Sequence, residues 1–111
     1  MWILDTENWK WKKIEYSGKI EARRSHSCQF NSRDKNQIFI FGGMTDGNFS
    51  QTDDLICLDT QSFSFNESLM TQNNKIFSRY GHASATWNSS MFIFGGSGGK
   101  NYVFIFFYFF L

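Results

Sequence analysis

The stretch IFIFGG at residues 38–43 recurs as MFIFGG at residues 91–96, 53 positions further along the chain. Short apolar runs that are rich in Ile and Phe and closed by glycine are typical of β-strands rather than helices. Neither run alternates polar with apolar residues, so we expect both faces of each strand to be buried between neighbouring sheets. The paired glycines suit a turn whose backbone needs positive φ or a close approach to another segment.

Three further pairs of landmarks recur in the same order around these two runs. The pairs, each separated by 54 to 56 residues, are Arg23 and Arg79, Asp5 and Asp59, and Trp11 and Phe65. Self-similarity at a fixed period of this length is the sequence signature of a stack of equivalent supersecondary units. The many aromatic residues favour β-strands within those units.

One complete unit is predicted to be a four-stranded antiparallel meander. Its strands are expected at residues 25–30, 38–41, 53–59 and 63–69, with a loop at residues 44–52. The strands expected in the other two units lie at residues 2–5 and 9–16, and at residues 81–87 and 91–94. The chain is therefore expected to hold one complete unit and two partial ones.

The ordered set of landmarks resembles the kelch repeat, one class of β-propeller blade. The matching residues in the complete unit are Arg23, His26, Ser27, Gly42, Gly43, Asp54, Leu55 and Asp59. The matching residues in the partial units are Trp11, Arg79, His82, Gly95 and Gly96. The chain departs from the family pattern at Phe65, which stands where the blade Trp is expected, and in having no proline before Arg23.

The resemblance implies an all-β fold of antiparallel four-stranded kelch-type blades that form an incomplete, open β-propeller. The kelch-repeat region is expected at residues 1–101, with a partial blade at 2–16, a complete blade at 23–69 and a partial blade at 78–101. Propellers close with about 4–8 blades, and a single blade cannot cover both of its faces. We therefore expect a fragment of a longer propeller, a truncated product, or a protein that associates with itself.

Residues 102–111, YVFIFFYFFL, form an apolar tail without a polar face. Because all of its residue types are compatible with T-rich codons, one hypothesis is that the tail is translated non-coding sequence. The alternative is a genuine apolar edge strand, which would tend to pair with other chains. The tail is too short to be a membrane-spanning helix, which needs about 20 apolar residues.

The sequence holds no strong catalytic or cofactor-binding motif. A net charge of +1 with interspersed signs argues against a nucleic-acid partner. Cys28, Cys57, His26 and His82 lack the spacing of a zinc site, and the two cysteines are expected two strands apart, too far for a disulfide. The glycine-rich stretch at residues 95–100 lacks the spacing of a phosphate-binding loop. We therefore expect no catalytic residue, no metal, no cofactor and no membrane partner.

Three arginines, Arg23, Arg24 and Arg79, are the candidate partner-binding residues. The resemblance implies that they lie near a face of the propeller that often carries a partner site, and Arg captures carboxylates through paired hydrogen bonds. The alternative role of Arg23 and Arg79, which match the motif, is to hold neighbouring blades together by bonding carbonyls or Asp side chains. The expected recognition loops are residues 44–52 and 71–78, since rigid scaffolds usually bind through loops.

The resemblance implies a protein–protein interaction module, a scaffold or adaptor with no catalysis of its own. The alternatives are a fragment of a kelch-like propeller enzyme and a truncated product without function. Its partners are expected to be proteins, including the remaining blades of a propeller or another copy of the chain. Because residues 1–5 lack a charged leader and an apolar run, the sequence predicts an intracellular protein.

Overall fold

The computed structural model describes residues 1–31, 33–45, 50–67, 76–88, 90–98 and 106–110, the last of these as backbone only. Every regular element in these residues is a β-strand. The strands are β1 (Trp2–Asp5), β2 (Lys10–Lys13), β3 (Arg23–Arg24), β4 (Ser27–Phe30), β5 (Gln37–Phe41), β6 (Met44–Thr45), β7 (Ser50–Gln51), β8 (Leu55–Asp59), β9 (Ser64–Glu67), β10 (Ala83–Trp87), β11 (Ser90–Phe94) and β12 (Phe106–Phe110).

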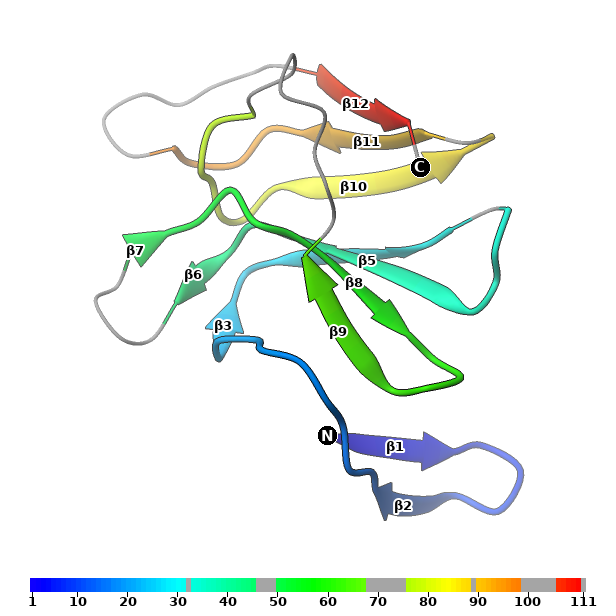
Figure 1. Cartoon of the computed structure of the whole chain (residues 1–111). Helices are drawn as coiled ribbons and strands as arrows, with labels where there is room; N and C mark the ends of the chain where they lie inside the picture. The colour runs from blue at the N-terminus through cyan, green and yellow to red at the C-terminus, as the bar shows by residue number, and fades with distance from the viewer. Residues whose placement is uncertain (32, 46–49, 68–75, 89, 99–105, 111) are drawn as a thin grey trace.

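The strands form four separate sheets in which every pairing is antiparallel (Figure 1). The largest is the four-stranded sheet β4-β5-β8-β9, followed by the three-stranded sheets β10-β11-β12 and β3-β6-β7 and the two-stranded sheet β1-β2. The described strands do not close into a ring. The prediction of an open, all-β arrangement with a four-stranded meander is confirmed.

The strand bounds follow the sequence repeat. β2 lies 54 residues before β9, and β11 lies 53 residues after β5. The predicted strand at residues 63–69 is observed as β9, and residues 68 and 69 lie outside the described part of the chain. The repeat therefore identifies β1 and β2 as the counterparts of β8 and β9, and β10 and β11 as the counterparts of β4 and β5.

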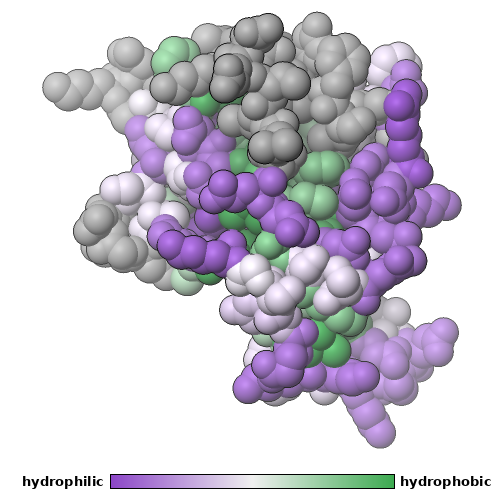
Figure 2. Space-filling view, viewed as in Figure 1, coloured by the Kyte–Doolittle hydropathy of each residue, from purple (hydrophilic) through white to green (hydrophobic). Residues whose placement is uncertain are grey.

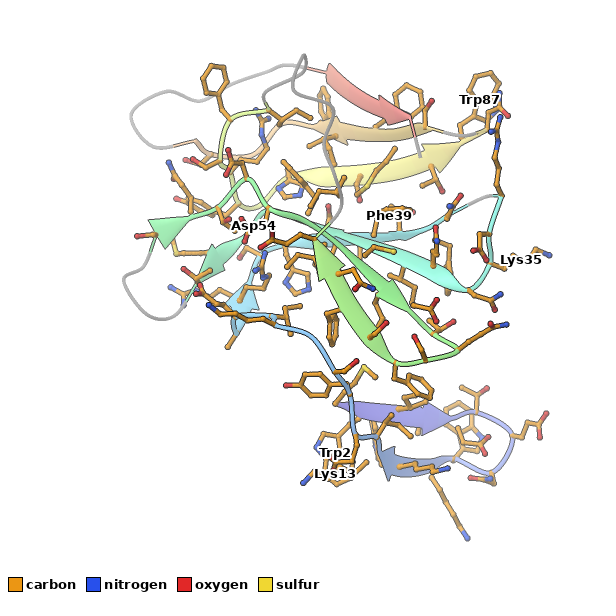
Figure 3. The ribbon with its side chains drawn as sticks, in the orientation of Figure 1. Trp2, Lys13, Lys35, Phe39, Asp54 and Trp87 are labelled. Carbon is orange, nitrogen blue, oxygen red and sulfur yellow. The ribbon has the colours of Figure 1, made fainter. Side chains whose placement is uncertain are left out.

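One face of the four-stranded sheet packs against the sheet that contains β11. The buried side chains at this junction are Phe39, Phe41, Leu55, Ile76, Met91 and Ile93. Figure 3 shows Phe39 between the two sheets. Full burial of one aliphatic or aromatic side chain stabilises a fold by about 1.5–3 kcal/mol, so this cluster holds the two sheets together.

The opposite face of the same sheet is buried against the N-terminal segment. Ile56, Leu58 and Phe65 form this second cluster, and partly buried Ile38 and Ile40 pack against it. Met1 and Ile20 contribute from the N-terminal side. Odd and even residues of β5 point to opposite faces, so the run at residues 38–41 is buried on both sides, as its lack of alternation predicts.

The two outermost sheets expose large apolar side chains. Trp2 is 61% exposed and Trp11 is 65% exposed on the β1–β2 hairpin, while Trp87 of β10 is 73% exposed. Figure 3 shows Trp2 beside Lys13 on the hairpin and Trp87 at the far end of β10. Figure 2 shows hydrophilic residues over much of the described surface in this view, with hydrophobic residues visible near the hairpin.

The expectation of a plain loop at residues 44–52 is wrong for part of that segment. β6 and β7 pair with each other, and β3 pairs with β6 through Arg23 opposite Thr45 and Arg24 opposite Met44. The reason is the turn at Gly42-Gly43, which sends the chain back beside the residues that precede β4. Residues 46–49 lie outside the described part of the chain.

The double-glycine turns have the predicted backbone conformation. Gly42 and Gly43 have φ values of 63° and 97°, and Gly95 and Gly96 have φ values of 69° and 87°. A Cβ atom added to Gly43 would lie 2.9 Å from the carbonyl oxygen of Arg24. The turn also joins two sheets, because the Gly43 amide donates a hydrogen bond of 2.8 Å to the Arg79 carbonyl oxygen.

The two cysteines lie on β4 and β8, with β5 between these strands. Both thiols are free. Cys28 is opposite Ile40, whereas Cys57 is opposite Phe39, so their side chains also leave the sheet on opposite faces. This arrangement matches the predicted separation.

Candidate functional site

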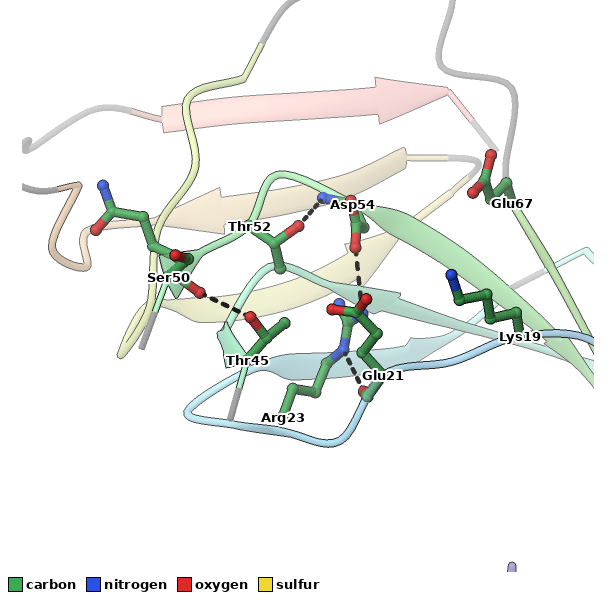
Figure 4. A pocket seen from close by; sticks show the side chains of 9 residues that line it. Lys19, Glu21, Arg23, Thr45, Ser50, Thr52, Asp54 and Glu67 are labelled. Carbon is green, nitrogen blue, oxygen red and sulfur yellow. Dashed lines mark hydrogen bonds and ion pairs between the residues drawn. The ribbon is translucent and has the colours of Figure 1, made fainter. Parts of the chain in front are cut away.

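A polar cavity of about 450 Å³ opens between the N-terminal linker (residues 14–22, between β2 and β3), the β6–β7 hairpin and the start of β8 (Figure 4). Its charged lining residues are Lys19, Glu21, Arg23, Asp54 and Glu67. Its uncharged lining residues are Thr45, Ser50, Gln51 and Thr52, which all come from the predicted recognition loop at 44–52. Hydroxyl, amide, carboxylate and cationic groups thus converge on one hollow.

Arg23 forms one wall of this cavity and braces it. Its side chain is only 4% exposed, and its Nη2 forms an ion pair of 3.2 Å with Oδ2 of Asp54, whose side chain is 48% exposed. Its Nη1 donates to the Gly42 carbonyl at 3.2 Å, and its Nε donates to the Glu21 carbonyl at 3.3 Å. Arg23 therefore ties the linker, the double-glycine turn and the start of β8 together.

Arg79 repeats two of these contacts in the next unit. Its Nη1 donates to the Gly95 carbonyl at 2.8 Å, and its Nε donates to the Phe77 carbonyl at 3.2 Å. The residue is 1% exposed, and burial lowers the pKa of its guanidinium. The Arg79 amide also donates to the Thr52 carbonyl at 3.2 Å, so this residue links two sheets.

Arg24 differs from the other two predicted arginines because it is exposed. Successive residues of a strand point to opposite sides, so the burial of Arg23 places Arg24 on the outer side of β3. Its Nη2 lies 3.2 Å from Sδ of Met44 on β6. The structure therefore places Arg23 in the cavity wall and Arg24 on the opposite side of β3, whereas Arg79 is enclosed at the junction of two sheets.

The motif histidines occupy different environments. His82 is 8% exposed, and its Nε2 lies 2.8 Å from Oγ of Ser27 on the neighbouring sheet. Burial, together with the nearby Arg79 guanidinium, lowers the pKa of His82 to about 4. His26 is exposed, and partial burial of its ring together with Arg23 lowers its pKa.

The contact between Ser27 and His82 is one that sequence reasoning missed. A hydroxyl within hydrogen-bond distance of an imidazole is the geometry of an activated nucleophile, but a histidine with a pKa of about 4 is a weak base at neutral pH. Gln29 continues the same row, because its Nε2 donates to the carbonyl and the hydroxyl oxygen of Ser84. The row joins β4 to β10. Only the shared motif position of His26 and His82 could have drawn attention to it.

The motif aspartate at the β8–β9 turn organises the local backbone. Oδ1 of Asp59 accepts hydrogen bonds of 2.9 Å from the Gln61 amide and 2.8 Å from the Ser62 amide. These backbone hydrogen bonds lower the pKa of Asp59. Asp5 repeats the arrangement in the first hairpin, where its Oδ1 accepts from the Glu7 amide at 2.9 Å.

The motif aromatic position is buried in only one of its two copies. Phe65 is 9% exposed and meets the Tyr16 ring edge-on, with centroids 5.3 Å apart. Its counterpart Trp11 is 65% exposed. Phe65 is covered because the linker after β2 crosses over it, whereas no described segment covers Trp11.

Two further features bear on chemistry. Among the residues that the structure describes, no three His, Cys, Asp or Glu side chains lie close enough together to hold a metal ion. In the same residues, no helix is long and apolar enough to cross a membrane. The predicted loop at residues 71–78 lies mostly outside the described residues, as do residues 99 and 100 of the glycine-rich stretch.

Comparison with known families identifies the repeat. The family model described as the KLHDC2/KLHL20/DRC7 Kelch-repeats domain matches residues 1–110. The chain belongs to this Kelch-repeat family. No curated protein matches the chain. The four-stranded sheet is accordingly a Kelch-type blade of an open propeller, and the family match indicates a protein-interaction module.

Proposed function

We propose that this Kelch-repeat chain acts as a scaffold or adaptor that binds a protein partner and has no catalytic activity of its own. The observation that carries the proposal is the polar cavity of about 450 Å³ beside the β6–β7 hairpin. Binding residues are often placed on loops that a rigid scaffold holds in position. Here the scaffold is the four-stranded blade, and the hairpin projects from its double-glycine turn.

The three arginines are proposed to have two different roles in recognition. Arg24 is exposed on β3, on the side opposite the Arg23 side chain that lines the cavity. It is proposed to contact the partner directly, because a guanidinium binds carboxylates in a specific planar geometry. Arg23 and Arg79 are proposed to act indirectly. They hold the double-glycine turns through the Gly42 and Gly95 carbonyls, and these turns fix the position of the loops.

A non-catalytic role is favoured over the enzyme alternative. The pair formed by Ser27 and His82 is the strongest candidate for chemistry among the described residues, but the low pKa of His82 opposes its use as a base. The pair is also part of a continuous row of contacts between β4 and β10. The blade boundaries proposed from the repeat, residues 2–16, 23–69 and 78–101, leave the cavity at the edge of the complete blade.

Site-specific photo-crosslinking tests the proposed surface. A photoreactive amino acid at Gln51, which lines the cavity, is expected to capture a partner protein in cells. The matched control carries the same group at exposed Lys35, which lies in the β4–β5 turn, away from Asp54 at the cavity (Figure 3). The Arg24→Glu substitution is expected to reduce the captured product, whereas Arg24→Lys should retain part of it.

Three outcomes would contradict the proposal. Capture of the same proteins with equal yield at Lys35 and Gln51 would show that the cavity is not the recognition surface. An undiminished product in the Arg24→Glu variant would remove Arg24 from the proposed contact and leave the cavity alone. A purified chain that turned over a substrate, with loss of turnover in Ser27→Ala, would overturn the non-catalytic assignment.

A further inference from the structure

The incomplete sheets at the two ends of the described chain are complementary halves of one blade. β1 and β2 correspond to β8 and β9, the third and fourth strands of the complete blade. β10 and β11 correspond to β4 and β5, its first and second strands. In the complete blade, β5 pairs with β8 along its whole length, from Phe41 opposite Leu55 to Gln37 opposite Asp59.

The β1–β2 hairpin lacks the support that its counterpart has. All four residues of β2 are exposed, and β1 pairs only with β2 in the described residues. Trp2 is 61% exposed, whereas its counterpart Ile56 is 4% exposed. A two-stranded hairpin is marginally stable in water, and the second edge of β1 is a template for another strand. Figure 1 shows the hairpin at one end of the molecule, apart from the larger sheets.

β12 occupies the edge of β11 where a third strand belongs. Its register is the same as that of β8 on β5, since Phe106 lies opposite Phe94 and Phe110 lies opposite Ser90. Position 110 corresponds to the turn residue Asp59, and Phe has no carboxylate to cap such a turn. The hairpin keeps this feature, because Asp5 accepts a hydrogen bond from the Glu7 amide. By its turn chemistry, β1–β2 matches this edge better than β12 does.

We propose that the β1–β2 hairpin of a second copy of this chain replaces β12 on β11 and completes a four-stranded blade between two molecules. The repeat fixes the register, with Trp2 opposite Ile93, Ile3 opposite Phe92 and Leu4 opposite Met91. The contact is head-to-tail, and the rotation between successive copies is proposed to be that between propeller blades, so that the assembly closes into a ring rather than an open filament. Each copy then contributes two blades, and a ring of 4–8 blades contains about two to four copies.

β12 is the competitor of the incoming hairpin. As part of the same chain, it meets β11 at an effective concentration in the millimolar range, which favours the closed monomer at low protein concentration. Removal of the tail leaves the edge of β11 unpaired, and association then depends on the concentration of the second copy. The tail therefore sets the concentration at which the chain assembles.

Light scattering after size-exclusion chromatography tests this competition. The full chain is expected to be monomeric at micromolar concentration, and a variant that ends at residue 101 is expected to form discrete species of about two to four copies. In the shortened variant, Leu4→Lys should restore the monomer, because the side chain at position 4 would face Met91 across the new strand pair. Trp9→Lys is the matched control, since Trp9 lies in the exposed turn of the same hairpin, and it should leave assembly unchanged.

Thiol crosslinking gives a second measurement that does not depend on the size of the assembly. Ile3→Cys and Phe92→Cys are placed in separate shortened chains that carry Cys28→Ser and Cys57→Ser. Mixing the two chains is expected to give a crosslinked pair between positions 3 and 92, and Trp9→Cys in place of Ile3→Cys should give little product. A shortened chain that stays monomeric, assembly unaffected by Leu4→Lys, or equal crosslinking from position 9 would each overturn the proposal.

Discussion

Acidification is predicted to remove about 3 kcal/mol from the free energy of unfolding through one side chain, His82. Its pKa in the folded chain is about 4, against an ordinary value of 6.5, and each pKa unit is worth about 1.4 kcal/mol. The unfolded chain takes up a proton on this imidazole below pH 6.5, whereas the folded chain does so only near pH 4. The contribution of His82 is therefore complete above about pH 6.5 and is lost as the pH falls towards 4.

The assay is urea unfolding followed by far-ultraviolet circular dichroism at a series of pH values between 4 and 8. Tryptophan fluorescence is a poor reporter, because all four tryptophans are more than 60% exposed in the folded chain. The test variant is His82→Gln, which keeps a hydrogen-bonding group near Ser27 without titrating. Its free energy of unfolding should change by about 3 kcal/mol less than that of the unmodified chain between pH 6.5 and pH 4.

His26→Gln is the matched control. The pKa of His26 is also lowered, by partial burial and by Arg23, but its residue is exposed, so its removal should flatten the pH dependence much less. The free energy of unfolding falls further at lower pH as Asp59 is protonated, because backbone hydrogen bonds depress its pKa in the folded chain. Equal pH dependence in the His82→Gln variant and the unmodified chain between pH 6.5 and 4 would refute the assignment.

Three further predictions concern stability and use the same unfolding assay. Gly42→Ala should lower the free energy of unfolding by at least about 1 kcal/mol more than Gly95→Ala does. The reason is that a Cβ at Gly42 would lie 2.7 Å from a carbonyl oxygen, whereas one at Gly95 would meet nothing within 4 Å. Equal losses in the two variants would mean that positive φ alone sets the cost. Arg23→Met should cost about 2 kcal/mol through its charge-assisted hydrogen bonds, and a cost near zero would contradict its bracing role. Phe65→Ala should cost about 3–4 kcal/mol while Trp11→Ala costs less than about 0.5 kcal/mol, and similar costs for the two would refute the burial argument.

Local pattern predicted the parts of the fold that repeat. The apolar runs that end in Gly42-Gly43 and Gly95-Gly96 identified β5 and β11, and the spacing of Asp5 and Asp59 identified the two hairpins that these aspartates cap. These signals lie within a few residues of each other, and their physics is local: positive φ, backbone capping and apolar burial. The resemblance to Kelch repeats, which rests on the same residues, is confirmed by the family match over residues 1–110.

The candidate site was less predictable because it is made of segments that are distant in sequence. Lys19 and Glu67 line the same cavity although nothing in the pattern relates them. The pairing of β3 with β6 likewise depends on how the double-glycine turn returns the chain. Ser27 and His82 meet only because β4 and β10 lie side by side, which follows from blade stacking and not from any local motif.

The hypothesis that the apolar tail is translated non-coding sequence stays a prediction. Residues 106–110 pair with β11 as an edge strand. Sequencing of the mature transcript tests the non-coding hypothesis, because a spliced form that lacks the codons of residues 102–111 would support it. Reads that run through these codons to a stop, with no spliced form, would argue against it.

Equivalent positions in this repeat contribute unequally to stability, because different neighbouring segments pack against them. Phe65 and Trp11 occupy the same place in their units, yet only Phe65 is buried, because Tyr16 packs against it. A Cβ added to Gly42 would meet the Arg79 carbonyl oxygen of the next sheet, whereas one added to Gly95 would meet nothing within 4 Å. The sequence repeat therefore sets which face of a blade is apolar, while an adjoining blade decides whether that face stabilises the fold. An adjoining blade packed on the outer faces should therefore raise the free energy of unfolding of the described sheets while their internal contacts stay the same.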